Sequence, residues 1–182
     1  MNRRNPLARL SIVLAGAALA VALVASAADS PTSSNSAKNG KGNAGWEWMK
    51  SLQGDWEGSY EGKVAARASY RLVSSGTALM ETLVSSDHSD MITMYTADGD
   101  RLMMTHYCSV NNQPRMRAPA AAGGAKRLVF DYVDATNLEA PDAMHMHRLV
   151  VTLNDPDHFS QQWTSREKGK DTSSTFSFTR KK

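Results

Sequence analysis

The sequence has 182 residues, of which 41% are hydrophobic, 21% charged and 7% aromatic. This size allows one globular domain with an appendage, and the composition excludes a wholly disordered chain. The formal charge of +3 is accounted for by Arg3, Arg4 and Arg9, so the rest of the chain is neutral. Because phosphate contacts need a surplus of Lys and Arg, a neutral chain without a basic stripe predicts no nucleic-acid partner.

Residues 1–27 have the three parts of a secretory signal peptide. Arginines form its basic start, an apolar run extends from Leu10 to Val24, and Ala25-Ser26-Ala27 is a small-residue cleavage site. The apolar run of about fifteen residues is shorter than the ~20 that a membrane-spanning helix needs. We therefore expect a periplasmic or secreted protein with no stable membrane insertion after signal removal. An uncleaved anchor and a twin-arginine signal are the alternatives.

Residues 28–45 are rich in Ser, Asn, Gly and Lys and predict a flexible linker. The domain is therefore expected over residues 46–182, a length that supports a single stable core. Cys108 is the only cysteine, so the chain has no intramolecular disulfide to form. Packing must supply the stability of this domain.

Short runs of β-branched and aromatic residues recur along the domain, separated by turn signals such as Asp98-Gly99-Asp100. Only Trp46–Leu52 has room for a short helix. The pattern predicts an all-β protein, an antiparallel up-and-down β-barrel of about 8–10 strands with a short N-terminal helix. The expected strands are Trp56–Tyr60, Ala66–Val73, Ala78–Val84, Met91–Thr96, Arg101–Cys108, Arg127–Val133, Met146–Leu153, Phe159–Ser165 and Thr172–Arg180.

Two short motifs resemble the calycin superfamily, which contains the lipocalin-like and fatty-acid-binding-protein-like barrels. Residues 52–58 read LQGDWEG, with a Gly-x-Trp motif on the first strand, and the last strand carries Phe176, Phe178 and Arg180. The resemblance implies that Arg180 packs over Trp56 and closes the base of the barrel. Nitrobindin-like barrels also begin with Leu-x-Gly-x-Trp-x-Gly, although their Tyr-Pro-Thr continuation is missing after Tyr60.

A barrel of this size has room inside for side chains or for one small ligand. Alternation places Met104, His106 and Cys108 on one face of their strand. A two-residue turn at Gly99 would add Tyr95 to that face, whereas a bulged turn would add Ile92 and Met94 instead. The polar stretch that follows Cys108 predicts a loop at the barrel mouth. The expected ligand-binding residues are Tyr95, Met104, His106 and Cys108 inside, with Asn112, Gln113 and Arg115 at the mouth.

The main alternative to a small apolar or amphipathic ligand is a haem- or metal-binding barrel, or an enzyme, that uses three histidines. The face of Leu149, Val151 and Leu153, extended backwards, includes His145 and His147, which with His106 would give three imidazole ligands. This places Met146 on the opposite face with Arg148.

Three further interpretations stay open at the level of the sequence. A Cys–His nucleophile at Cys108 and His106 lacks a recognisable base orienter and oxyanion site. The methionines are typical of core filling, of an adaptable cavity or of copper binding, and haem is a further cofactor alternative. The third interpretation is a structural domain with a filled core. We predict no catalytic residue and no cofactor, and the pattern favours a binding protein over an enzyme.

Overall fold

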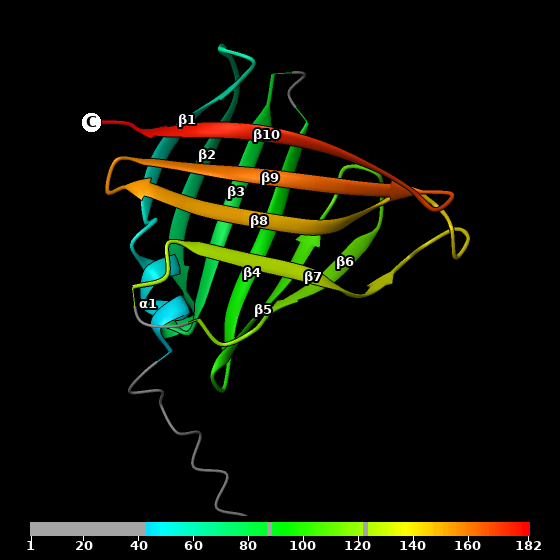
Figure 1. Cartoon of the computed structure of the whole chain (residues 1–182), viewed down its shortest axis with the longest axis horizontal. Helices are drawn as coiled ribbons and strands as arrows, with labels where there is room; N and C mark the ends of the chain where they lie inside the picture. Colours follow the sequence, from blue (N-terminus) through cyan, green and yellow to red (C-terminus); the bar gives the residue numbers. More distant parts are fainter. Residues whose placement is uncertain (1–42, 87–88, 122–123) are drawn as a thin grey trace, which may run out of the picture. The chain divides into compact units, whose positions relative to one another are not determined.

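The computed structural model describes residues 43–86, 89–121 and 124–182, which belong to the unit Asn35–Lys182. The predicted signal peptide and most of the predicted linker lie outside the described residues. One short helix precedes ten antiparallel strands, and these strands form a closed barrel (Figure 1). This architecture confirms the predicted fold class. The elements are α1 (Ala44–Lys50), β1 (Gly54–Tyr60), β2 (Lys63–Val73), η1 (Ser74–Gly76), β3 (Ala78–Ser85), β4 (Asp90–Asp98), β5 (Arg101–Tyr107), β6 (Gln113–Ala118), β7 (Arg127–Thr136), β8 (His145–Asp155), β9 (His158–Glu167) and β10 (Lys170–Arg180).

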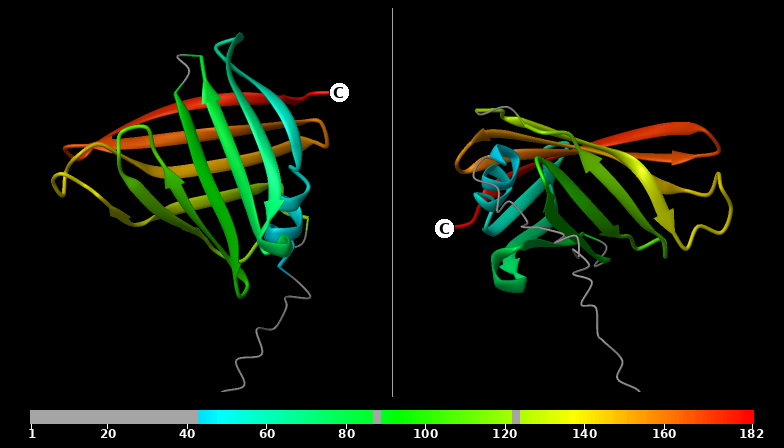
Figure 2. Two further views of the ribbon diagram at one scale, coloured as in Figure 1. Left: turned by 180° about the vertical axis from the view of Figure 1, so that it is seen from behind. Right: turned by 90° about the horizontal axis from the view of Figure 1, so that it is seen from below.

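Each strand pairs with the next along the chain, and β10 returns to pair with β1. The closing register runs from Trp56 opposite Arg180 to Ser59 opposite Ser177. The views in Figure 2 show the strands wrapping around one interior. Closure matters because an open sheet edge exposes unpaired backbone groups that invite aggregation.

The turn between β4 and β5 sets which residues face inward. Asp98 lies opposite Arg101, so Gly99 and Asp100 form a two-residue turn. Gly99 has a φ of +63°, which suits this tight hairpin connection. The resulting register places Tyr95 opposite Met104 and on the buried face.

The structure corrects one prediction about the region after Cys108. We expected a polar loop, but residues 113–118 form β6, which is the strand missing from the sequence-based set. Pro114, Met116 and Ala118 are buried and alternate with outward-facing charged residues. This strand was hidden because proline and arginine are poor strand markers, although the alternation itself is present in the sequence.

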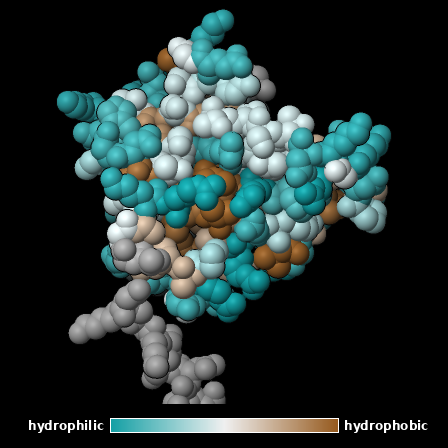
Figure 3. Space-filling view, in the orientation of Figure 1, coloured by the Kyte–Doolittle hydropathy of each residue, from teal (hydrophilic) through white to brown (hydrophobic). Residues whose placement is uncertain are grey.

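The alternating inward faces of the ten strands pack much of the interior, as expected for a small barrel. The face of the molecule shown in Figure 3 is mostly hydrophilic around a limited apolar patch. The largest fully buried side chains are Trp56, Tyr70, Tyr95, Phe130, Phe159, Phe178, Met49, Leu52, Leu79, Leu102, Met104 and Met116.

Helix α1 lies at the end of the barrel where β1 begins. The Asn43 side chain caps the helix by accepting from the Trp46 amide at 3.0 Å and anchors it by donating to the Arg101 carbonyl at 3.0 Å. Met49 and Leu52 are fully buried in the core beneath it. Across the described residues, no helix combines the length and apolarity needed to cross a membrane.

Trp56 seals this end of the barrel from the inside. It is fully buried, and its indole N–H donates to the Leu52 carbonyl at 2.8 Å. The Phe159 ring meets the Trp56 ring edge-on at 4.6 Å. The Arg180 guanidinium lies 4.1 Å from the centre of the indole ring, which is cation–π geometry.

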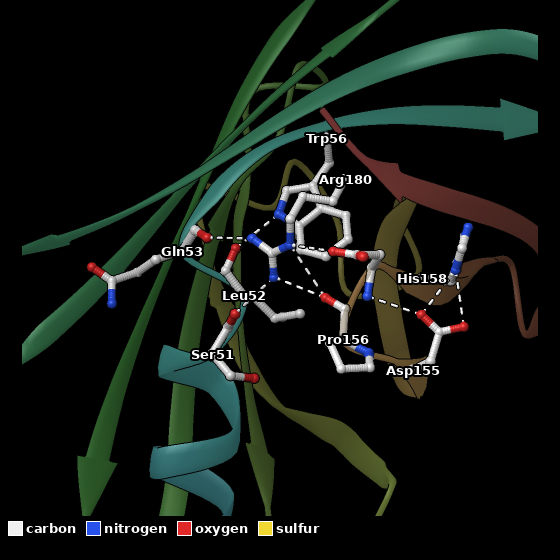
Figure 4. A network of polar contacts seen from close by, with 9 residues as sticks. Ser51, Leu52, Gln53, Trp56, Asp155, Pro156, His158 and Arg180 are labelled. Atoms are coloured by element: carbon white, nitrogen blue, oxygen red, sulfur yellow. Dashed lines mark hydrogen bonds and ion pairs between the residues drawn. The ribbon is translucent and has the colours of Figure 1, made fainter. Parts of the chain in front are cut away.

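Arg180 also ties three chain segments together through its guanidinium (Figure 4). It donates to the Gln53 carbonyl at 2.7 Å and to the Ser51 carbonyl at 3.0 Å, both just after α1. It donates from Nε and Nη2 to the Pro156 carbonyl in the turn between β8 and β9. An ion pair with Asp157 at 3.2 Å completes the set.

Gly54 and Gly58, on either side of Trp56 in the sequence, are required for different structural reasons. Gly54 has a φ of +128°, a conformation that strains other residues, and a Cβ there would meet the Arg180 guanidinium at 2.8 Å. Gly58 leaves room for Phe178, because a Cβ would lie only 2.6 Å from that ring. The Gly-x-Trp-x-Gly spacing thus follows from packing at the closed end.

Replacing Arg180 with Ala should destabilise the fold by about 2–4 kcal/mol, because it removes a cation–π contact and leaves several carbonyls without a protein donor. Urea unfolding measures this loss. The stability of Arg180→Lys should lie between those of wild type and Arg180→Ala, since an ammonium keeps the charge but not the planar, forked donor geometry of the guanidinium. Arg71→Ala, which breaks the exposed ion pair with Asp55, is the matched control and should cost no more than about 1 kcal/mol. Equal losses for Arg180→Ala and Arg71→Ala would contradict the closing role.

Candidate functional site

An apolar cavity of about 210 Å³ lies inside the barrel, toward the end opposite Trp56 and Arg180. It is lined at the ends of β3, β5 and β9 and at the starts of β2, β4, β8 and β10. Apolar side chains make up most of its wall, and hydroxyl groups lie on β3, β9 and β10. The lining residues are Ala66, Leu83, Ser85, Met91, His106, Met146, Trp163, Ser165, Thr172, Ser174 and Phe176.

Among the described residues of that lining, His106 is the only one with a titratable side chain. It is 2% exposed, and burial lowers its pKa to about 4, so the imidazole is neutral near pH 7. Its Nδ1 lies 2.9 Å from the Thr93 hydroxyl, and its ring lies 4.7 Å from that of Trp163. Among the described residues, its ring makes one hydrogen bond, which joins Nδ1 to Thr93.

A buried polar network links the cavity wall to the centre of the barrel. The Trp163 indole N–H donates to the Gln161 side-chain oxygen at 3.1 Å. The Gln161 amide in turn donates to Glu81 at 2.8 Å and lies 2.8 Å from the Tyr70 hydroxyl. The Tyr95 hydroxyl donates to the other carboxylate oxygen of Glu81 at 2.7 Å.

Glu81 is fully buried at the centre of this network. Burial raises the pKa of its carboxyl, and hydrogen bonds from Tyr95, Gln161 and Tyr70 offset part of that rise. Burial, together with the neighbouring Glu81 charge, raises the pKa of Tyr70 and Tyr95 well above the ordinary value. The core therefore holds a carboxyl with no cationic partner among the described residues.

The predicted ligand-binding residues are distributed over four environments. His106 lines the cavity, whereas Tyr95 and Met104 are packed in the core and do not. Arg115 lies on the outer surface of β6, where it pairs with Asp134. The remaining three, Cys108, Asn112 and Gln113, line a separate pocket.

That separate pocket is polar, with a volume of about 650 Å³, between the β5–β6 and β7–β8 connections. Asn112 is 3% exposed, and its amide donates to the Met144 carbonyl at 2.8 Å while its side-chain oxygen lacks a partner among the described residues. Cys108 is buried. Among the described contacts, no hydrogen bond joins the Cys108 thiol to the His106 ring, so the two residues do not form a nucleophile–base pair.

The structure corrects the expected faces of β8. A bulge lies between Met146 and Arg148, so Met146 rather than the histidine pair lines the cavity. The extra residue reverses the alternation on which the prediction depended. His147 instead lines an outer pocket. Within the described ranges, no three His, Cys, Asp or Glu side chains are arranged to hold a metal, so His106 does not join His145 and His147.

Sequence reasoning missed the residues that organise this interior. Glu81 lies on the same face of β3 as Leu79 and Leu83, so the alternation along this strand predicts that its side chain points inward. Gln161 and Trp163 likewise follow Phe159 on one face of β9. Polar residues at inward positions of a strand are the signal that would have identified this network.

No protein-family model and no curated protein matches this sequence. Among solved structures, the chain is similar to a protein of unknown function from the DUF3598 family of Nostoc punctiforme, with 14% sequence identity and a TM-score of 0.41. The alignment covers 73% of this chain and 49% of that protein, so the chain spans about half the length of its match.

Replacing Glu81 with Gln should remove a pH dependence of stability. The folded state holds the Glu81 proton more tightly than the unfolded chain, since burial raises the carboxyl pKa. Its contribution is therefore fully present below the ordinary carboxyl pKa and is lost as the pH rises through the raised value. Wild type should lose stability relative to Glu81→Gln between about pH 4 and the raised pKa.

Urea unfolding of both proteins across this pH range measures the difference. Glu57→Gln on the exposed face of β1 serves as the control and should track the wild type. Parallel stability curves for wild type and Glu81→Gln would contradict the raised pKa.

Proposed function

We propose that this protein is an exported, calycin-like barrel that binds a small, predominantly apolar molecule carrying one polar group. The observation that carries the proposal is the apolar cavity with one neutral, buried imidazole in its wall. The Trp56–Arg180 closure matches the role that the calycin resemblance implies. The signal-peptide pattern of residues 1–27 supports export.

The cavity volume limits the size of the ligand. An engineered apolar cavity of about 150 Å³ accommodates benzene, whereas drug-sized ligands occupy pockets of about 300–1,000 Å³. A cavity of about 210 Å³ therefore suits a one- or two-ring aromatic compound or a short branched chain. A long acyl chain exceeds this volume and would extend past the exposed Thr172 at the rim of the cavity.

The polar group of the ligand would meet His106. Thr93 occupies Nδ1, which leaves Nε2 as the nitrogen available at the cavity wall. A neutral imidazole offers either a donor or an acceptor there, according to its tautomer. The Trp163 ring beside it provides an aromatic face for stacking, and both Met91 and Met146 provide adaptable apolar contacts.

Filling the cavity should abolish binding. Met91 lines the cavity near the start of β4, so Met91→Trp should place an indole in the space that a ligand needs. Titration with 1-naphthol, followed by its fluorescence, should give one site in wild type and none in Met91→Trp. Ile92→Trp is the matched control, because Ile92 is the next residue on the same strand and is 38% exposed. Retained binding in Met91→Trp would exclude this cavity as the site.

Removing the imidazole should weaken only the ligand that can hydrogen-bond. His106→Leu should reduce the affinity for 1-naphthol by about 3- to 10-fold, the cost of one neutral hydrogen bond. The affinity for naphthalene, which has no hydroxyl, should stay the same or rise. Competition against a bound fluorophore measures both ligands under the same conditions. Equal changes in affinity for 1-naphthol and naphthalene would show that His106 lines the cavity without hydrogen-bonding the ligand.

A further inference from the structure

His145 and His147 form a pair on the opposite side of the bulge from the cavity. The Nε2 of His145 lies 3.1 Å from the Nδ1 of His147. The Tyr132 ring packs against both imidazoles, with centroids 4.8 and 4.9 Å away and only 24° between its plane and that of His147. This packing holds the orientation of both imidazoles.

The protonation of His145 is fixed by its backbone partner. Its Nδ1 lies 2.8 Å from the Ala143 carbonyl oxygen, which can only accept, so Nδ1 carries the proton. The Nε2 of neutral His145 therefore presents a lone pair toward His147. A backbone carbonyl that accepts from the other ring nitrogen is the usual outer partner of a metal-binding histidine.

We propose that His145 and His147 bind one divalent transition-metal ion, through Nε2 of the first and Nδ1 of the second. Two nitrogens 3.1 Å apart, each about 2.0–2.1 Å from an ion, subtend roughly 100° at that ion. This angle lies between those of square-planar and tetrahedral coordination, and imidazole is a preferred ligand of copper, zinc and nickel.

Without a metal, the same distance corresponds to a hydrogen bond from His147 Nδ1–H to His145 Nε2. Metal binding replaces that proton, which moves to Nε2 of His147. The neutral pair therefore accepts the ion without a net loss of protons from the protein. The step needs neither an oxidant nor a reductant.

The outer pocket beside His147 provides room for the remaining coordination positions. Its volume is about 440 Å³, and Gln162, Thr164 and Ser173 supply polar groups that can hold metal-bound water. Because no third protein ligand is arranged at the pair within the described residues, water completes the coordination.

Two ion pairs offset part of the positive charge around this pocket. Arg148 pairs with Asp131 at 3.1 Å and Arg166 with Asp171 at 2.6 Å. Burial and the Arg166 charge lower the pKa of His147, and the Asp171 and Asp131 charges offset part of that effect, so Arg166 keeps some repulsion toward a cation.

Titration of the full chain with Cu²⁺, followed by electron paramagnetic resonance, tests the proposal. Wild type should bind one equivalent with nitrogen hyperfine coupling from two imidazoles. His145→Gln and His147→Gln should each weaken that equivalent by at least about tenfold. His158→Gln is the matched control, since His158 is an exposed histidine paired with Asp155, and it should retain the site. Equal binding in wild type and His147→Gln, or loss of binding in His158→Gln alone, would overturn the proposal.

A second measurement on the wild type needs no variant and holds even if His145→Gln misfolds. Substoichiometric Cu²⁺ should broaden the amide resonances of residues 145–148 and Tyr132 before those around His158. Broadening confined to the chain start or to His158 would also overturn the site. The 1-naphthol titration is independent of this outcome, because no described residue lines both the cavity and the outer pocket beside His147.

Discussion

The contact between Arg180 and Trp56 is the interaction on which this barrel depends. A meander of ten strands has two ends in sequence, and its first and last strands pair only if something fixes them together. Arg180 does so from the end of β10 by covering the indole on β1 and donating to carbonyls after α1 and in the β8–β9 turn. One side chain thereby joins three segments that are far apart in sequence, and it closes the base of the interior.

With that end sealed by aromatic packing, the polar groups of the interior lie farther along the barrel. Phe159 stacks on Phe178 at 4.7 Å and meets Trp56 edge-on. Glu81 lies beyond this aromatic packing, and hydrogen bonds from Tyr95 and Gln161 hold its carboxyl group in place of a counter-charge. Such a network costs stability if any member is unsatisfied, so it specifies the positions of its partners closely. One of its outer members, Gln161, holds Trp163 and therefore shapes the cavity wall.

The barrel could be predicted because its strands alternate and several of its turns carry a glycine with positive φ. The Gly-x-Trp motif and Arg180 lie in short local patterns that are readable without coordinates. The strand β6 could not be recognised from composition, since Pro114 and two arginines conceal its inward face. The site was harder still. The expected mouth position of Arg115 depended on a loop at residues 113–118. In the strand that forms there, Arg115 alternates with Pro114 and Met116 and therefore faces outward, where it pairs with Asp134 of β7.

The bulge at His147 shows how one residue can decide the chemistry of two surfaces. In a regular strand, Met146 would share the face of Arg148, and both histidines would share the face of Leu149. The register shift turns Met146 into the cavity and leaves His147 in the outer pocket. Deleting His147, the extra residue, would restore regular alternation with Met146 still facing the cavity, and it would remove the histidine pair. The bulge is therefore the feature that keeps the two histidines together on the far side of the cavity, as bulges near functional sites commonly redirect side chains.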